Sequence, residues 1–251
     1  DITFAMRSSQ PDFTGVEDAI HPGAAGHVIM ASTIIERSTP DRRSVSNITI
    51  VPNGGEWIAG RKQEVRDLTV SGDGSEMSFL FLAPALPWVV PESAAGYDLK
   101  WGPSAPASLG YELTKAGHKL SREQLRVDGL PAGEYELKID DTAVGSFTAL
   151  MLGAGVELQK YHHTPQSRQS LDVAMLNQRR NDEVIRPLRD LWARVKGLQR
   201  KNDPAMFEEN YPKLKAEIDA LNEQAKAIED EIYRINQPVP RRYQLKKVEK
   251  N

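Results

Sequence analysis

The opening segment GVEDAIHPGAAGHVIMA, residues 15–31, places an aspartate and a histidine three residues apart. A serine hydrolase needs an imidazole that takes the proton of a nucleophilic hydroxyl group and later gives it to the leaving group. It also needs a carboxylate that fixes the tautomer of that imidazole. Within a turn, the three-residue offset lets the carboxylate of Asp18 reach Nδ1 of His21 while Nε2 faces a cleft. Asp18 and His21 are therefore candidate catalytic residues.

The spacing also fits a second interpretation, in which both side chains hydrogen-bond to the backbone of their own loop. On spacing alone, this alternative stays open. His27 follows six residues after His21, at the start of an apolar run with helical spacing. We expect His27 in the first turn of that helix, making a structural hydrogen bond.

The longer string resembles the last conserved block of the SGNH/GDSL hydrolases, and the matching residues are Asp18, His21, Pro22, Gly26 and His27. The resemblance implies that Asp18 and His21 are the acid and base of a triad and that the following helix packs on a sheet. The stretch LRVDGLPAGEYELKIDDTAVGSFTALMLGAGVEL, residues 125–158, resembles the accessory β region of large bacterial SGNH hydrolases, often from polysaccharide degraders. Two later helical segments and a Pro-containing tail also resemble that branch.

The nucleophile of that family does not have a counterpart in this chain. The family's Gly-Asp-Ser block, and the Gly and Asn blocks of its oxyanion hole, all precede the Asp-x-x-His block. Only 17 residues precede Asp18, whereas a catalytic domain needs roughly 100–200. The segment SGDGS, residues 71–75, lies between two predicted strands and is interpreted as a hairpin turn. Ser8 and Ser9 lack a strand-to-helix elbow.

We therefore expect the nucleophile on a missing N-terminal catalytic segment, either in the same polypeptide or as a second chain. The isolated chain is expected to be inactive. The chain starts at Asp1 without a signal-peptide pattern, which we interpret as an excised boundary. The resemblance implies a secreted or periplasmic bacterial protein.

The elements predicted around this segment give an α+β fold. It would combine the C-terminal end of an α/β SGNH domain, a β-sandwich-like middle and a long antiparallel helical hairpin. Short β-branched or aromatic runs such as NITIV, EMSFLFLA and GEYELKIDD predict an antiparallel sandwich. The predicted regions are 1–39 (end of the catalytic domain), 44–150 (accessory β domain), 151–166 (connecting loop), 167–236 (helical hairpin) and 237–251 (tail).

Apolar residues recur at spacings of three and four in two segments of the hairpin, 184–198 and 214–235. The segment KNDPAMFEENYP is expected to separate the two helices, and Pro187 to start or kink the first. The basic, Pro-broken tail is expected to be an extended surface strand or a solvated end.

Composition excludes several classes of function. The net charge is −3 and hydrophobic residues make up 39% of the chain, so no basic surface for nucleic acid is expected. The longest apolar run, MSFLFLAPALPWVV, is interrupted by two prolines and is shorter than the ~20 residues of a membrane span. The absence of cysteine excludes disulfides, thiolate metal sites and a cysteine nucleophile. We expect no cofactor, metal, nucleic acid or membrane partner.

Three further groups of residues each have a functional and a structural interpretation. The adjacent His162 and His163 lack a carboxylate at ligand spacing, so a metal site is not favoured. Arginines of the first long helix are expected to form a solvated face with acidic neighbours, or else to meet an acidic sugar or the missing domain. Five aromatic residues fit either a platform for sugar rings or burial in the core, namely Trp57, Trp88, Tyr97, Trp101 and Tyr111.

The sequence thus predicts SGNH-type ester hydrolysis, with an ester or acetylated polysaccharide as substrate. The alternative is a noncatalytic carbohydrate-binding or scaffolding module in which the Asp18 and His21 segment is a relic.

Overall fold

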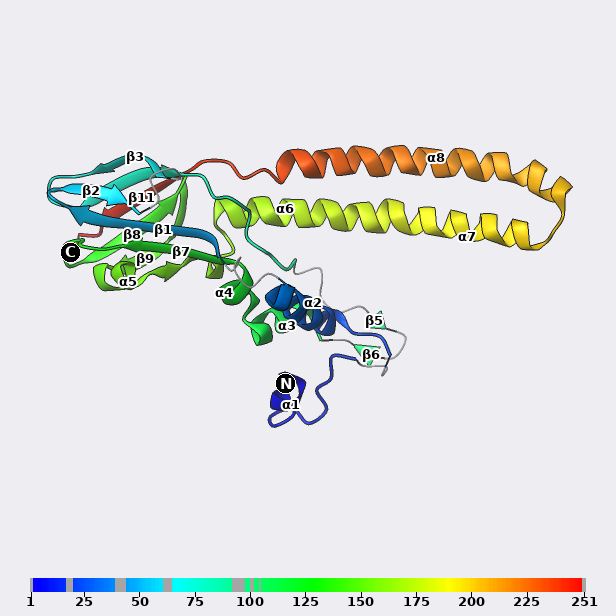
Figure 1. The fold of residues 1–251 in the computed structure, drawn as a ribbon, viewed down its shortest axis with the longest axis horizontal. Helices are drawn as coiled ribbons and strands as arrows, with labels where there is room; N and C mark the ends of the chain where they lie inside the picture. The colour runs from blue at the N-terminus through cyan, green and yellow to red at the C-terminus, as the bar shows by residue number, and fades with distance from the viewer. Residues whose placement is uncertain are drawn as a thin grey trace. The chain divides into compact units, whose positions relative to one another are not determined.

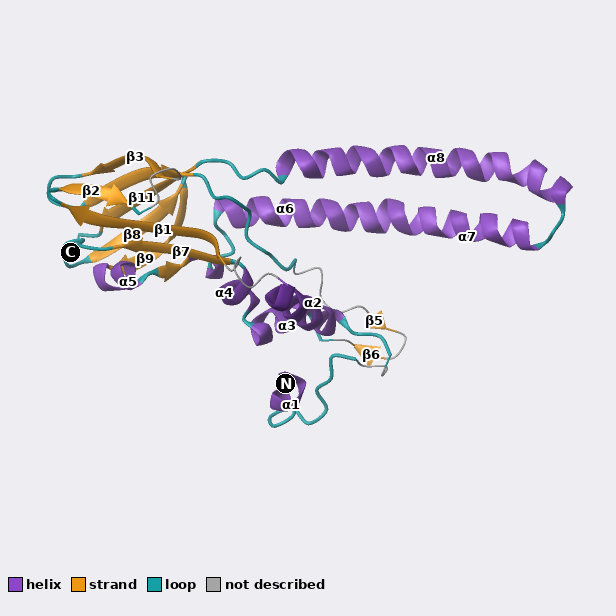
Figure 2. Cartoon of the chain, in the orientation of Figure 1, coloured by secondary structure: helices purple, strands orange, loops and turns teal. Residues whose placement is uncertain are grey.

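The computed structural model divides the chain into two compact units, which are described separately. Unit 1 contains residues 1–171 and 238–251, and unit 2 contains residues 172–237. The mixture of helices and strands confirms the predicted α+β class (Figure 2). The residues that the structure describes are 2–16, 20–38, 44–60, 65–91, 98–99, 102–103 and 105–249.

Two sheets form the centre of unit 1 (Figure 1). Their strand orders are β10-β7-β1-β2 and β3-β4-β11-β8-β9. Alternate residues of both sheets, including Ile48, Phe79, Leu125 and Leu137, belong to one buried cluster, so the sheets pack face to face as a sandwich. The strands are β1 (Ser44–Asn53), β2 (Glu56–Ala59), β3 (Val65–Val70), β4 (Glu76–Phe81), β7 (Arg122–Val127), β8 (Glu134–Ile139), β9 (Thr142–Thr148), β10 (Val156–Glu157) and β11 (Arg241–Lys247).

The expectation of a wholly antiparallel sandwich is wrong at one pairing. Strands β1 and β7 are parallel, with Ile48 paired to Leu125 and Ile50 to Val127. Parallel pairing needs a long connection, and the chain between these strands provides one. Local hairpin signals cannot report such a pair, because its two strands are far apart in the sequence.

The tail forms a strand, as one of the two expectations had it, but this strand lies inside the sheet and not at its surface. Strand β11 is an interior strand that pairs with β4 on one side and β8 on the other. Tyr243 and Leu245 are buried, and Gln244 between them is exposed. The alternation in RRYQLKK is that of a strand with one buried face, whereas the basic residues suggested a solvated end. The expected turn at residues 71–75 is confirmed, and Ser75 N donates to Asp73 Oδ1 over 3.0 Å.

Helices of unit 1 lie before the sandwich and between its strands. They include α3 and α4, which have no strong helix signal in the sequence because Gly110 and Gly117 lower helix propensity. A short two-stranded sheet pairs β5 (Asp98–Leu99) with β6 (Gly102–Pro103). The helices are α1 (Ile2–Met6), α2 (Ala24–Ser38), α3 (Ala107–Thr114), α4 (Ala116–Leu120), α5 (Ala149–Ala154) and the 3-10 helix Leu158–Lys160.

Unit 2 is the predicted helical hairpin (Figure 2). The expected apolar stripes pack against each other in two clusters, one centred on Leu191 and Ile218 and the other on Val184 and Ile228. Its helices are α6 (Pro165–Arg179, which begins in unit 1), a π-helical turn (Arg180–Ile185), α7 (Arg186–Arg200) and α8 (Pro204–Ile235).

The break between α6 and α7 confirms the role predicted for Pro187. Proline cannot donate to the preceding turn, and the π-helical turn directly precedes the helix that contains it. The predicted separator between the helices is too long, because α8 already begins at Pro204 and Asp203 caps it by accepting from Met206 N over 3.1 Å. None of the helices in the described part of the chain is long and apolar enough to cross a membrane.

Candidate functional site

His21 lies on an exposed loop three residues before the start of α2. The backbone around it is closely packed. Gly23 N donates to the Gly15 carbonyl oxygen over 3.0 Å. A Cβ atom added to Gly26 would lie 2.0 Å from that same oxygen, so only glycine allows the loop to lie on the first turn of α2. The glycines of the motif thus allow the loop that carries the His21 imidazole to pack closely against α2.

The helix that follows is itself held by α3. Ala25 N donates to the Ala105 carbonyl oxygen over 3.1 Å. A Cβ atom on Gly110 would come 2.5 Å from the Ala25 oxygen, so the two helices cross with their backbones in close contact. The loop of His21, α2 and α3 therefore form one tightly packed group.

Asp18 belongs to residues 17–19, which lie outside the described residues. Its pairing with His21 stays a prediction. His27 is described, and its role is confirmed. It lies in the first turn of α2, and its Nδ1–H donates to the Gly23 carbonyl oxygen over 2.9 Å.

One face of α2 is apolar and exposed. Met30 is 51% exposed and Ile34 is 61% exposed. Ile20, next to His21, is 75% exposed, and Phe4 of α1 is 81% exposed. Burying such side chains is favourable, so this face is suited to packing against another apolar surface beside the imidazole.

A second histidine–carboxylate pair, not predicted from the sequence, lies elsewhere in unit 1. His118 Nδ1 is 2.6 Å from Glu157 Oε1, and Gln159 Nε2 donates to Glu157 Oε2 over 2.7 Å. Burial alone would raise the pKa of Glu157, but the hydrogen bond and charge of His118 lower that pKa overall. Within the described residues, no hydroxyl group is hydrogen-bonded to His118. The pair has the geometry of a base with its orienting acid, without a nucleophile.

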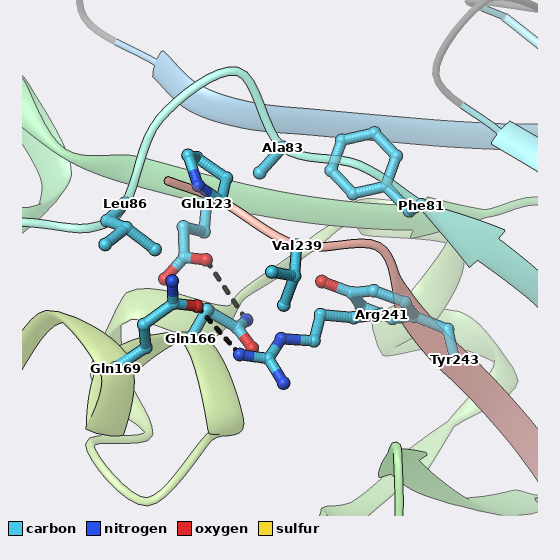
Figure 3. A pocket seen from close by; sticks show the side chains of 10 residues that line it. Phe81, Ala83, Leu86, Glu123, Gln166, Gln169, Val239, Arg241 and Tyr243 are labelled. Atoms are coloured by element: carbon cyan, nitrogen blue, oxygen red, sulfur yellow. Dashed lines mark hydrogen bonds between the residues drawn. The ribbon is translucent and has the colours of Figure 1, made fainter. Parts of the chain in front are cut away.

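A buried glutamate forms a third feature, shown in Figure 3. Glu123 of β7 is 1% exposed, and its Oε1 accepts from Gln166 Nε2 over 3.1 Å. Burial raises the pKa of Glu123 to about 7, against the weaker lowering effect of that hydrogen bond. Glu123 alternates with Leu125 and Val127, which are buried on the same face of the strand. The alternation of Glu123 with two apolar residues along the strand is the sequence feature that could have indicated a buried glutamate.

The aromatic residues considered as a sugar-binding platform do not form one among the described residues. Trp88 and Tyr111 meet edge to face, with centroids 5.3 Å apart, and Trp57 packs against the core. Tyr97 and Trp101 lie outside the described residues. No flat exposed pair for sugar stacking is thus found in the part of the chain that is described.

The arginine-rich helix and the histidine pair have ordinary partners. Arg180 of the π-helical turn pairs with Glu229, and Arg186 pairs with Asp182. This is the solvated face with acidic neighbours that was one of the two expectations. His163 Nε2–H donates to the Ala143 carbonyl oxygen over 3.1 Å. No group of three potential metal ligands is present among the described residues.

No protein-family model and no curated protein matches the chain. A solved structure described as a gut microbial diltiazem-metabolizing enzyme is similar to it, with 29% sequence identity and a TM-score of 0.79. The likeness covers 98% of this chain and 60% of that chain. The present chain thus spans about three fifths of a structural neighbour that is an enzyme.

Proposed function

We propose that the chain is the C-terminal part of an SGNH/GDSL-type serine ester hydrolase. The observation that carries this proposal is the likeness of nearly the whole chain to an enzyme that metabolizes diltiazem. Diltiazem itself contains an acetate ester, so ester hydrolysis is one reaction by which it can be metabolized. The Asp-x-x-His segment adds the base and acid that such a reaction uses.

In the proposed mechanism, His21 takes the proton of a serine hydroxyl group and returns it to the alcohol that leaves. Asp18 holds the imidazole in the required tautomer and stabilises its protonated form. The serine and the oxyanion-hole donors belong to a segment outside residues 1–251. The exposed apolar residues Ile20, Met30 and Ile34 support this arrangement, because they offer that segment an apolar surface on the loop of His21 and on the helix that follows it.

Acetylated polysaccharides are the substrate class we propose, with a secreted or periplasmic location. Both assignments rest on the resemblance of residues 125–158 to accessory regions of polysaccharide-degrading SGNH hydrolases. Fold-level likeness alone does not fix a substrate. The isolated chain is expected not to react with a fluorophosphonate probe, and a labelled serine within it would contradict this assignment.

The decisive experiment compares three histidine variants of the protein assembled with its N-terminal catalytic segment, using hydrolysis of p-nitrophenyl acetate and of acetylated xylan. We expect His21→Ala to lower kcat by at least ~10³-fold, as loss of a triad base does. His27→Ala should have little effect, because its role is structural. If His118→Ala abolished activity while His21→Ala did not, the base would be the His118–Glu157 pair and the proposal would fail.

A further inference from the structure

The pocket around Glu123 lies inside unit 1 and is small. Four segments line it, namely β7, the first two turns of α6, the residues around the start of β11, and the end of β4 with the loop that follows it. Apolar side chains of Phe81, Leu86 and Val239 close its other sides. The cavity volume open to water is about 10 Å³, close to the minimum for a single water molecule.

Three of the side chains that line this space each carry a buried polar atom without a hydrogen-bond partner among the described residues. These atoms are Glu123 Oε2, Gln166 Oε1 and Arg241 Nε. Glu123 and Gln166 are 1% and 5% exposed, so bulk water does not satisfy their oxygens. Leaving such atoms unpaired is costly. Figure 3 shows the carboxyl, amide and guanidinium groups gathered in one pocket.

The hydrogen-bonding needs of the three atoms can be met by one small molecule. When Glu123 is ionised, two of the atoms are acceptors and one is a donor, and a water molecule can donate twice and accept once. Buried waters typically make about three such bonds. A cation would meet the guanidinium group of Arg241, and an anion would meet the carboxyl group of Glu123, so both fit less well.

We propose that this pocket is a built site for one ordered water molecule. The water donates to Glu123 Oε2 and Gln166 Oε1 and accepts from Arg241 Nε. It thereby links the sandwich to the two points where the chain leaves for the helical hairpin and returns from it. A direct hydrogen bond also joins β11 to α6, because Arg241 Nη2 donates to Gln169 Oε1 over 2.8 Å.

The first test is a high-resolution crystal structure of the full chain. We expect a spherical density peak within hydrogen-bonding distance of all three atoms. An empty pocket, or side chains that pair directly with one another, would overturn the proposal.

The second test fills the pocket without removing a polar group. Ala83 lines it, and Ala83→Val would displace the water and leave its partners unsatisfied. We expect hydrogen exchange in residues 120–128 and 238–247 to become roughly fivefold faster, the size expected for loss of one net hydrogen bond. In a dry apolar pocket the added methyl groups would instead slow exchange or leave it unchanged, which would contradict the water site. Ala85→Val, at an exposed position two residues later, is the matched control and should leave exchange unchanged.

Discussion

At the scale of single residues, Glu123 makes the clearest energetic prediction. Its pKa is about 7 in the folded protein, against 4.5 for a solvated glutamate. The folded state therefore keeps this proton to a higher pH than the unfolded state does. The contribution of Glu123 to stability is complete below about pH 4.5 and is lost as the pH rises through 7.

The groups that surround Glu123 do not titrate in the same range. Burial raises the pKa of Tyr111 to about 12, with a further rise from the charge of Glu123. Burial also raises the pKa of Tyr243. Arg241 is paired with Asp140, with 3.0 Å between Nη1 and Oδ2. A change in stability between pH 5 and pH 8 that disappears when Glu123 alone is replaced can thus be assigned to the glutamate.

We expect Glu123→Gln to remove this pH dependence, because the amide keeps the shape of the side chain and cannot ionise. Relative to the variant, the wild-type protein should lose about 2–3 kcal/mol of unfolding free energy between pH 5 and pH 8. Urea unfolding at both pH values measures the difference. Glu112→Gln, at an exposed position of α3, serves as control and should follow the wild type. An unchanged pH dependence in Glu123→Gln would show that another group titrates.

At the scale of elements, β11 carries more of the fold than its composition suggests. Tyr243 is 2% exposed and stacks on Phe79 with centroids 5.1 Å apart. We expect Tyr243→Ala to lower the free energy of unfolding by about 3–5 kcal/mol, as for other buried aromatic residues. Gln244→Ala, on the exposed face of the same strand, should change it by less than ~0.5 kcal/mol. Equal effects of the two substitutions would mean that β11 is not an interior strand.

Local patterns predicted the elements whose signal is local. The strands β1, β4 and β8, the turn at residues 71–75 and the stripes of the hairpin were all predicted from short-range periodicity. The position of β11 and the parallel pairing of β1 with β7 depend on contacts between distant segments. No spacing within one segment encodes those contacts, so they were missed.

The same distinction holds for the candidate sites. Asp18 and His21 are three residues apart and form one motif, so sequence alone could select them. Glu123 and Gln166 are separated by 43 positions, and His118 and Glu157 by 39. Only the packing of β7 with α6, and of α4 with β10, brings these side chains together, and a single sequence does not reveal it.

At the scale of the whole molecule, the two units have separate cores. Every residue of the sandwich cluster belongs to unit 1, and the clusters around Leu191 and Val184 belong to unit 2. Each unit therefore buries its own apolar surface, which is the physical requirement for folding independently. The hairpin is an insertion that begins within α6, after residue 171, and ends before β11, so unit 1 is closed by a strand that follows the insertion in the chain.

We expect unit 1 to fold without the hairpin, because the sandwich core does not depend on residues 172–237. Those residues would be replaced by a flexible Gly/Ser linker of about 10 residues, which spans roughly 16–19 Å on average. The variant should keep the hydrogen-exchange protection of β8 and β11 and a cooperative unfolding transition. The same linker in a protein that also carries Tyr243→Ala should lose both, because β11 then lacks its anchor. If the linker variant alone failed to protect β11, the hairpin would be needed to bring the last strand into the sheet, and the two units would fold as one.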